Sequence, residues 1–157
     1  MKKSGKAFLL TSGILETIYA SFALLGSLLI LGLSFISLDL AALDSFGIAG
    51  AATAILVAIG LLVMAVGILL LVFGILSIRT STKEPNSYYA AKGKILVFAI
   101  IESILLVLML IGTLTGGVMK DTTSIVATVI VLVVFALVVA FKYVAFAMMA
   151  KHSKSQK

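Results

Sequence analysis

Four long apolar stretches constrain the fold of this chain more than any other feature. A helix needs about 20 apolar residues to cross the ~30 Å hydrocarbon core of a bilayer. Because a backbone in lipid must satisfy its own hydrogen bonds, and strict polar–apolar alternation is absent, we expect helices and not barrel strands. The sequence predicts an all-α, four-span transmembrane bundle that forms a single integral membrane domain over residues 1–157. The expected spans are at about 7–33, 47–78, 95–114 and 125–150.

Composition argues against most soluble and catalytic functions. Apolar residues make up 62% of the chain and charged residues only 11%, whereas a soluble domain carries about 25% charged residues. There is no cysteine, and the single histidine, His152, lies in the C-terminal tail. Thiolate or imidazole metal centres, Ser-His-Asp triads and phosphate loops are therefore not expected. We predict a protein that is not an enzyme and needs no cofactor and no metal.

The basic residues gather at the ends of the spans. Ten of the twelve lie near the two termini or in the connection 79–94, whereas the connection 37–45 is acidic and 115–123 is near neutral. The positive-inside rule then places both termini and the loop 79–94 in the cytoplasm of a multi-pass protein of the cell membrane. This pattern suits an anionic inner leaflet and not nucleic acid, and Tyr88 and Tyr89 fit either an interfacial anchor or a solvated loop. The ten basic residues are Lys2, Lys3, Lys6, Arg79, Lys83, Lys92, Lys94, Lys151, Lys154 and Lys157.

Two parts of the sequence resemble each other. Residues 14–18 match residues 100–104 conservatively, and 24–28 match 110–114 at the same offset. The second and fourth spans match more weakly. Because the alignment pairs a rare glutamate, a hydroxyl and a glycine, we expect a duplicated two-helix hairpin. The two hairpins would be parallel, related by an axis along the membrane normal.

Small residues recur every seven positions in the first two spans. Lipid tails are as apolar as leucine, so membrane helices associate by close packing at such stripes, and a seven-residue period favours a left-handed crossing near ~20°. We expect the first two helices to pack as a hairpin, although glycine and alanine are also simply common in membrane helices. The stripes are Gly13, Ala20, Ser27 and Ser34 in the first span, and Thr53, Gly60, Gly67 and Gly74 in the second.

Three ionisable residues, Glu16, Glu102 and Lys142, fall well inside the spans. Each lies about 12–15 Å from the nearest cytoplasmic lysine at ~1.5 Å per residue, so the three share one layer. A charge at the bilayer centre costs at least ~2.5 kcal/mol and should face a partner inside the bundle. Lys142 is the one partner of opposite sign at this depth. Tyr19, one turn from Glu16, completes the predicted polar cluster.

Two carboxylates and one ammonium do not cancel. If Lys142 pairs with one glutamate, the other lies in a low dielectric beside a like charge, and we expect it to be protonated at neutral pH. The cluster then has three possible roles. It is a clamp that fixes the register of the helices, a site that loads a proton or a monovalent cation, or a docking point for a charged residue of a partner protein.

The segment GILET at 13–17, with a glutamate in the first of four spans, resembles the small multidrug-resistance exporters. The resemblance implies that Glu16 binds a proton and a cationic drug in turn. The chain departs from the pattern of that family, because it has no tryptophan, a second membrane glutamate, a long cytoplasmic loop and longer spans. These departures put the drug-binding role in doubt.

The water-exposed connections are too short to hold a soluble active domain. We therefore expect a non-enzymatic accessory or scaffold subunit that associates laterally, in a homo-oligomer or with a partner membrane protein. The alternative is a small proton- or cation-coupled transporter or channel that uses the intramembrane glutamate pair.

Overall fold

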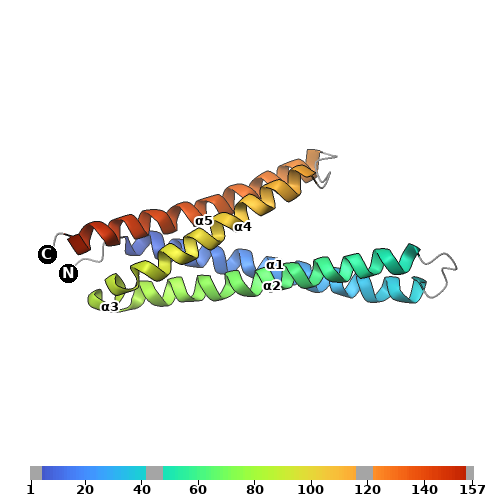
Figure 1. The fold of residues 1–157 in the computed structure, drawn as a ribbon, viewed down its shortest axis with the longest axis horizontal. Helices are drawn as coiled ribbons and strands as arrows, with labels where there is room; N and C mark the ends of the chain where they lie inside the picture. Colours follow the sequence, from blue (N-terminus) through green and yellow to red (C-terminus); the bar gives the residue numbers. More distant parts are fainter. Residues whose placement is uncertain (1–4, 42–47, 116–121, 155–157) are drawn as a thin grey trace. The chain divides into compact units, whose positions relative to one another are not determined.

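The computed structural model describes residues 5–41, 48–115 and 122–154, with side chains over 5–36, 51–115 and 125–152. Residues 42–45 of the predicted acidic connection and 116–121 of the near-neutral connection lie outside the described residues, which include neither Asp44 nor the side chain of Asp39. All regular secondary structure in the described residues is helical (Figure 1). The helices are α1 Lys6–Ala41, α2 Ile48–Thr82, α3 Pro85–Ala90, α4 Lys92–Thr115 and α5 Thr122–Lys154.

Four of these helices are long and apolar enough to cross a membrane. The prediction of an all-helical fold with four long apolar helices suited to crossing a membrane is thus confirmed, and each candidate span lies within a few residues of its predicted position. Large apolar side chains on these helices remain exposed, as expected where lipid and not water covers the surface. The spans are Lys6–Ile36, Ala51–Thr82, Lys92–Thr115 and Ile125–His152.

Most of the predicted loop 79–94 is helical. Helix α2 continues through its polar end to Thr82, and α3 begins at Pro85. Proline suits the first turn of a helix, where its missing N–H would have had no intrahelical partner. The N–H of Ala91 then bonds to the carbonyl of Tyr88 at 3.2 Å, and α4 follows directly. A drop in apolarity therefore marks the edge of the span and not the end of the helix.

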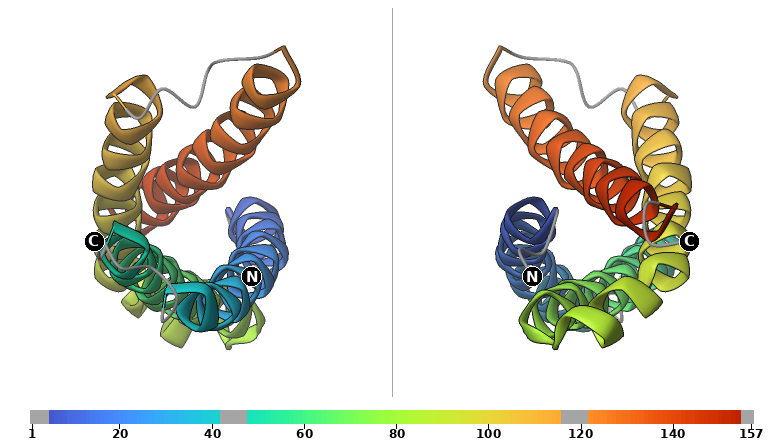
Figure 2. Two further views of the ribbon diagram at one scale, coloured as in Figure 1. Left: turned by 90° about the vertical axis from the view of Figure 1, so that its right-hand side faces the viewer. Right: turned by 90° about the vertical axis from the view of Figure 1, so that its left-hand side faces the viewer.

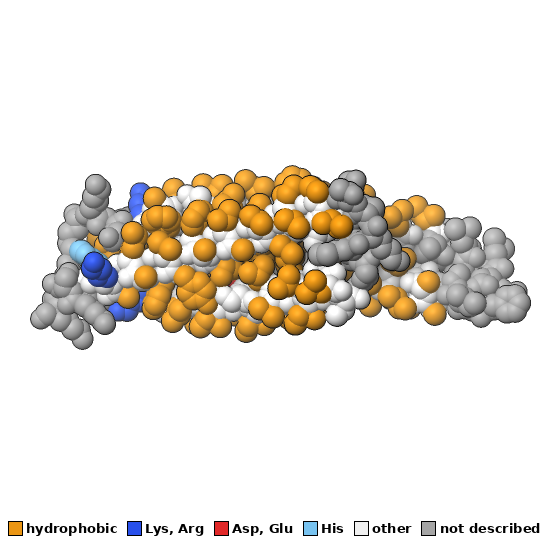
Figure 3. Space-filling view, turned by 90° about the horizontal axis from the view of Figure 1, so that it is seen from above, with side chains coloured by type: hydrophobic (Ala, Val, Ile, Leu, Met, Phe, Trp, Pro, Cys, Tyr) orange, Lys and Arg blue, Asp and Glu red, His pale blue; other side chains and the backbone are white. Residues whose placement is uncertain are grey.

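The chain divides into two compact units, which are described separately. The first unit comprises residues 1–16 and 73–157, and the second comprises 17–72. In the first unit α4 packs along α5, and α3 contacts both helices. Figure 2 shows that α4 and α5 cross at an angle. Lysine and arginine side chains of this unit gather at one end, beside apolar flanks (Figure 3).

In the second unit α1 and α2 pack along their small-residue stripes. A Cβ added at Gly60 would meet Leu31 at 2.9 Å, and one added at Gly67 would meet Leu24 at 3.0 Å. The described stripe residues of this unit, Ala20, Ser27, Ser34, Thr53, Gly60 and Gly67, are all buried.

The stripe continues into the first unit through Gly13 and Gly74. A Cβ added at Gly13 would lie 2.8 Å from the carbonyl oxygen of Gly74 and 2.8 Å from Cγ1 of Ile78. No flexible side chain separates the two backbones at this point. The absence of side-chain volume at Gly13 is therefore what allows α1 to approach α2 this closely.

Candidate functional site: a buried ion-pair cluster

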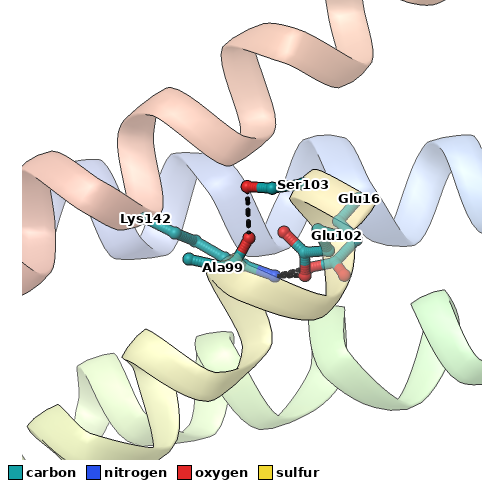
Figure 4. Close-up of polar contacts among 5 residues, drawn as sticks. All are labelled: Glu16, Ala99, Glu102, Ser103 and Lys142. Atoms are coloured by element: carbon teal, nitrogen blue, oxygen red, sulfur yellow. Dashed lines mark hydrogen bonds and ion pairs between the residues drawn. The ribbon is translucent and has the colours of Figure 1, made fainter. Parts of the chain in front are cut away.

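Three helices of the first unit bring opposite charges into contact. Glu16 of α1, Glu102 of α4 and Lys142 of α5 have no exposed surface. The Lys142 ammonium donates to Oε2 of Glu16 at 2.5 Å and also to Oε1 of Glu102 (Figure 4). The sequence analysis considered a pair between Lys142 and one glutamate. In the structure, one amine bridges both carboxylates.

Helical spacing explains why Lys142 points inward. Along α5, residues three or four positions apart form one buried seam that includes Phe135, Val138, Val139, Lys142 and Ala145. Side chains at this spacing lie on the same face of a helix. The long lysine side chain therefore follows the apolar packing face of α5 into the protein, and its ammonium reaches the carboxylates of the neighbouring helices.

Two aromatic rings flank the amine. Phe73 and Phe98 stack with their centroids 4.4 Å apart and an angle of 18° between the ring planes. The Lys142 nitrogen lies 5.8 Å from the centroid of the Phe73 ring and 5.9 Å from that of Phe98. At this range a ring face attracts a cation, most strongly where water is excluded. The ammonium is thus held by two carboxylates and two ring faces.

Several buried oxygens of the first unit are not satisfied by the described part of the chain. Oε1 of Glu16, Oε2 of Glu102 and the hydroxyls of Ser12 and Ser77 are buried and have no hydrogen-bond partner there. Ser12 lies one turn from Glu16 on α1. Burying a polar atom without a partner is costly, and more so for a charge. With all three groups ionised, the cluster would carry a net negative charge.

Tyr19 belongs to the second unit, where it is half-buried, so its part in the polar cluster stays a prediction. Phe73 was not predicted, because nothing in the apolar run of α2 distinguishes the face toward the charges. Phe98 lies one turn before Glu102, and that spacing was a usable signal.

In the described residues, no group of three or more histidine, aspartate or glutamate side chains is placed to hold a metal ion.

The two tyrosines of α3 pack against protein. Tyr88 has no exposed surface and lies in a core with Leu9, Ile95 and Met149, so neither a lipid anchor nor a solvated position is correct for it. Burial, and to a lesser degree the neighbouring Tyr89, raises the pKa of Tyr88 to about 12. Tyr89 stacks on His152 with ring centroids 4.5 Å apart. These contacts fasten α3 to the ends of α4 and α5.

Comparisons of the chain with known protein families, with curated proteins and with solved structures found no match.

Proposed function

We propose that this chain is a non-enzymatic membrane subunit that associates laterally, with a second copy or with a partner membrane protein. The observation that carries the proposal is a hydroxyl pair on the surface of α4 and α5. Ser103 Oγ donates to the carbonyl of Ala99 at 2.7 Å and lies 3.2 Å from the Tyr143 hydroxyl. Because the Ser103 proton is already used, the Tyr143 hydroxyl is the donor in the second bond.

This hydroxyl pair lies where acyl chains would otherwise cover it. Ser103 is near the middle of the span Lys92–Thr115, and the Tyr143 side chain is 38% exposed. Both hydroxyl protons are used within the chain, but the two oxygens can each still accept a hydrogen bond, and lipid offers them no donor. A shallow groove of about 310 Å³ beside the pair offers space for side chains of another helix. Ile100, Ser103, Ile104, Val107, Leu108 and Tyr143 line it.

The buried cluster supports this proposal as an internal clamp. The Lys142 ammonium uses both carboxylates, and all three side chains are closed off from the surface. Such a cluster fixes the register of α1, α4 and α5, whereas the groove beside Ser103 and Tyr143 is open to another molecule. The meeting of Glu16 and Glu102 at one amine also favours the duplicated hairpin, since the two glutamates occupy equivalent positions in it.

The proposed topology places both termini and α3 in the cytoplasm of the cell. Lys6, Arg79, Lys83, Lys94 and Lys151 are exposed and lie at the ends of the spans in the first unit. Cytoplasmic loops and ends carry such an excess of basic residues. The localisation to the cell membrane rests on the same argument.

Mass measurement of the complex in mild detergent tests lateral association. We expect the wild-type protein to run as a complex larger than the monomer, or to retain a partner. Tyr143→Phe combined with Ser103→Ala should weaken that complex by about tenfold, the scale of one or two interhelical hydrogen bonds. Thr113→Val is the matched control, because among the described residues the Thr113 hydroxyl on α4 bonds only to the carbonyl of Leu110 within the same helix. A strictly monomeric wild-type protein without a co-purifying protein would contradict the proposal.

A second candidate function is proton- or cation-coupled transport. The observation that favours it is the uneven charge of the cluster together with its unpartnered oxygens, including Oε1 of Glu16 and Oε2 of Glu102. Both carboxylates bind the single Lys142 ammonium (Figure 4), so one added proton would balance the charge of the cluster. A monovalent cation would do the same.

Flux measurements in proteoliposomes test this second function. If the protein transports, protons, a monovalent cation or a lipophilic cation should cross in wild type, and Glu16→Gln and Glu102→Gln should each abolish the flux. Glu84→Gln is the matched control, since Glu84 is exposed and lies between the spans. The same variants should remove a protonated-carboxyl infrared band from the spectrum of the wild-type protein. Absence of both flux and band excludes this function.

A further inference from the structure

A cavity of about 430 Å³ lies between α2, α3 and α4 in the first unit. It sits at the edge of two spans, where Ala51–Thr82 ends and Lys92–Thr115 begins. Its wall includes polar and charged side chains from all three helices, namely Thr80, Lys83, Ser87 and Lys94. This cavity is not the space around the buried ion-pair cluster, because none of the residues that line the cavity carries a carboxylate.

The polar wall has the chemistry of a phosphate site. Lys83 and Lys94 provide two ammonium groups, and neither forms an ion pair with any residue that the structure describes. Both side chains are exposed, so they reach a ligand without losing a bond inside the protein. Thr80 and Ser87 add hydroxyl donors. Ammonium groups bind phosphate oxygens as point charges, and hydroxyls complete the contacts.

The remaining wall is apolar. Leu76 lies one turn before Thr80 on α2, and Phe98 lies one turn after Lys94 on α4, so both are deeper in their spans than the polar residues. A ligand that fills the cavity therefore meets cations at the membrane edge and hydrocarbon on the side of the bilayer. Free phosphate matches only the first half of this wall, whereas a phospholipid matches both.

We propose that this cavity binds the phosphate headgroup of an anionic phospholipid. The headgroup lies between Lys83 and Lys94, with an acyl chain along Leu76 and Phe98. Basic pockets between membrane helices on the cytoplasmic side are places where such headgroups bind. The site is independent of lateral association, because it lies on α2, α3 and the start of α4 and not at the groove beside Ser103 and Tyr143.

Native mass spectrometry of the full chain, released from mild detergent with added phosphatidylglycerol or phosphatidylcholine, tests the site. We expect wild type to retain phosphatidylglycerol about thirtyfold more strongly than phosphatidylcholine, since the two basic residues near the headgroup contribute ~1 kcal/mol each. The double variant Lys83→Ala/Lys94→Ala should lose this preference. Lys6→Ala/Lys151→Ala is the matched control, because it removes two exposed lysines at the ends of spans that do not line the cavity.

Three results would contradict the proposal. If Lys83→Ala/Lys94→Ala and Lys6→Ala/Lys151→Ala lose the preference for phosphatidylglycerol equally, the lipid is attracted by all the basic residues at this end of the unit and not by the cavity. Displacement of phosphatidylglycerol by millimolar inorganic phosphate would identify free phosphate as the ligand. Unchanged retention in Lys83→Ala/Lys94→Ala would exclude the cavity, and circular dichroism of each variant verifies that its helices are intact.

Discussion

Replacing Lys142 with methionine is expected to destabilise the protein by about 3–5 kcal/mol, the cost of removing one partner from a buried ion pair. The reason is that Glu16 and Glu102 would remain buried without the amine that now holds both. Methionine keeps the length and apolar character of the lysine stem, so the loss reports on charge and not on a cavity. Unfolding in mixed micelles, followed by circular dichroism, measures the change.

A charge-free cluster provides the control for this experiment. The triple variant Glu16→Gln, Glu102→Gln, Lys142→Met removes all three charges together, and it should recover most of the stability because no buried charge is left unpaired. Wild-type stability in Lys142→Met would show that the cluster does not hold the helices. A triple variant as unstable as the single variant would assign the loss to packing.

Gly13→Ala should destabilise the protein by about 1–3 kcal/mol, the usual cost of inserting a methyl group into a filled contact. The new Cβ would lie 2.8 Å from the carbonyl oxygen of Gly74 and 3.0 Å from the backbone nitrogen of Ile78. Because backbone atoms cannot rotate away as a side chain does, α1 and α2 would have to separate locally. The same unfolding measurement detects this.

Gly112→Ala is the matched control for Gly13→Ala. Gly112 lies in the helix interior of α4, where an added Cβ meets nothing within 4 Å among the described residues. Alanine is a better helix former than glycine by up to ~1 kcal/mol, so this variant should be neutral or more stable. Equal effects at Gly13 and Gly112 would mean that helix propensity, and not the contact with Gly74, determines the outcome at both positions.

The spans were predictable because a bilayer imposes one simple condition, a minimum length of apolar helix. The same condition says nothing about polar residues beyond the span, so the continuation of α2 to Thr82 and the short helix α3 were missed. Tyr88 illustrates a second limit. A tyrosine beside a span has two environments compatible with its chemistry, and only the packing of Leu9 and Met149 around it selects the buried one.

Depth along each helix was also predictable, because a rise of ~1.5 Å per residue converts position into height. This placed Glu16, Glu102 and Lys142 in one layer, where the structure has them in contact. The depth of a residue along its helix does not determine which way its side chain points, because that direction depends on the rotation of the helix about its own axis. The bridging of both carboxylates by one amine, and the stacked rings of Phe73 and Phe98 beside it, depend on rotations of the helices that one sequence does not specify.

The order in which the three charged residues are synthesised has a consequence for membrane insertion. Lys142 is separated from Glu102 by 40 positions and from Glu16 by 126, and it is made last. Glu16 therefore leaves the ribosome well before the base that neutralises it is made, and Glu102 leaves the ribosome ahead of Lys142. Until the final helix arrives, the nascent chain must keep these acids uncharged, or hold them at the insertion machinery out of contact with lipid.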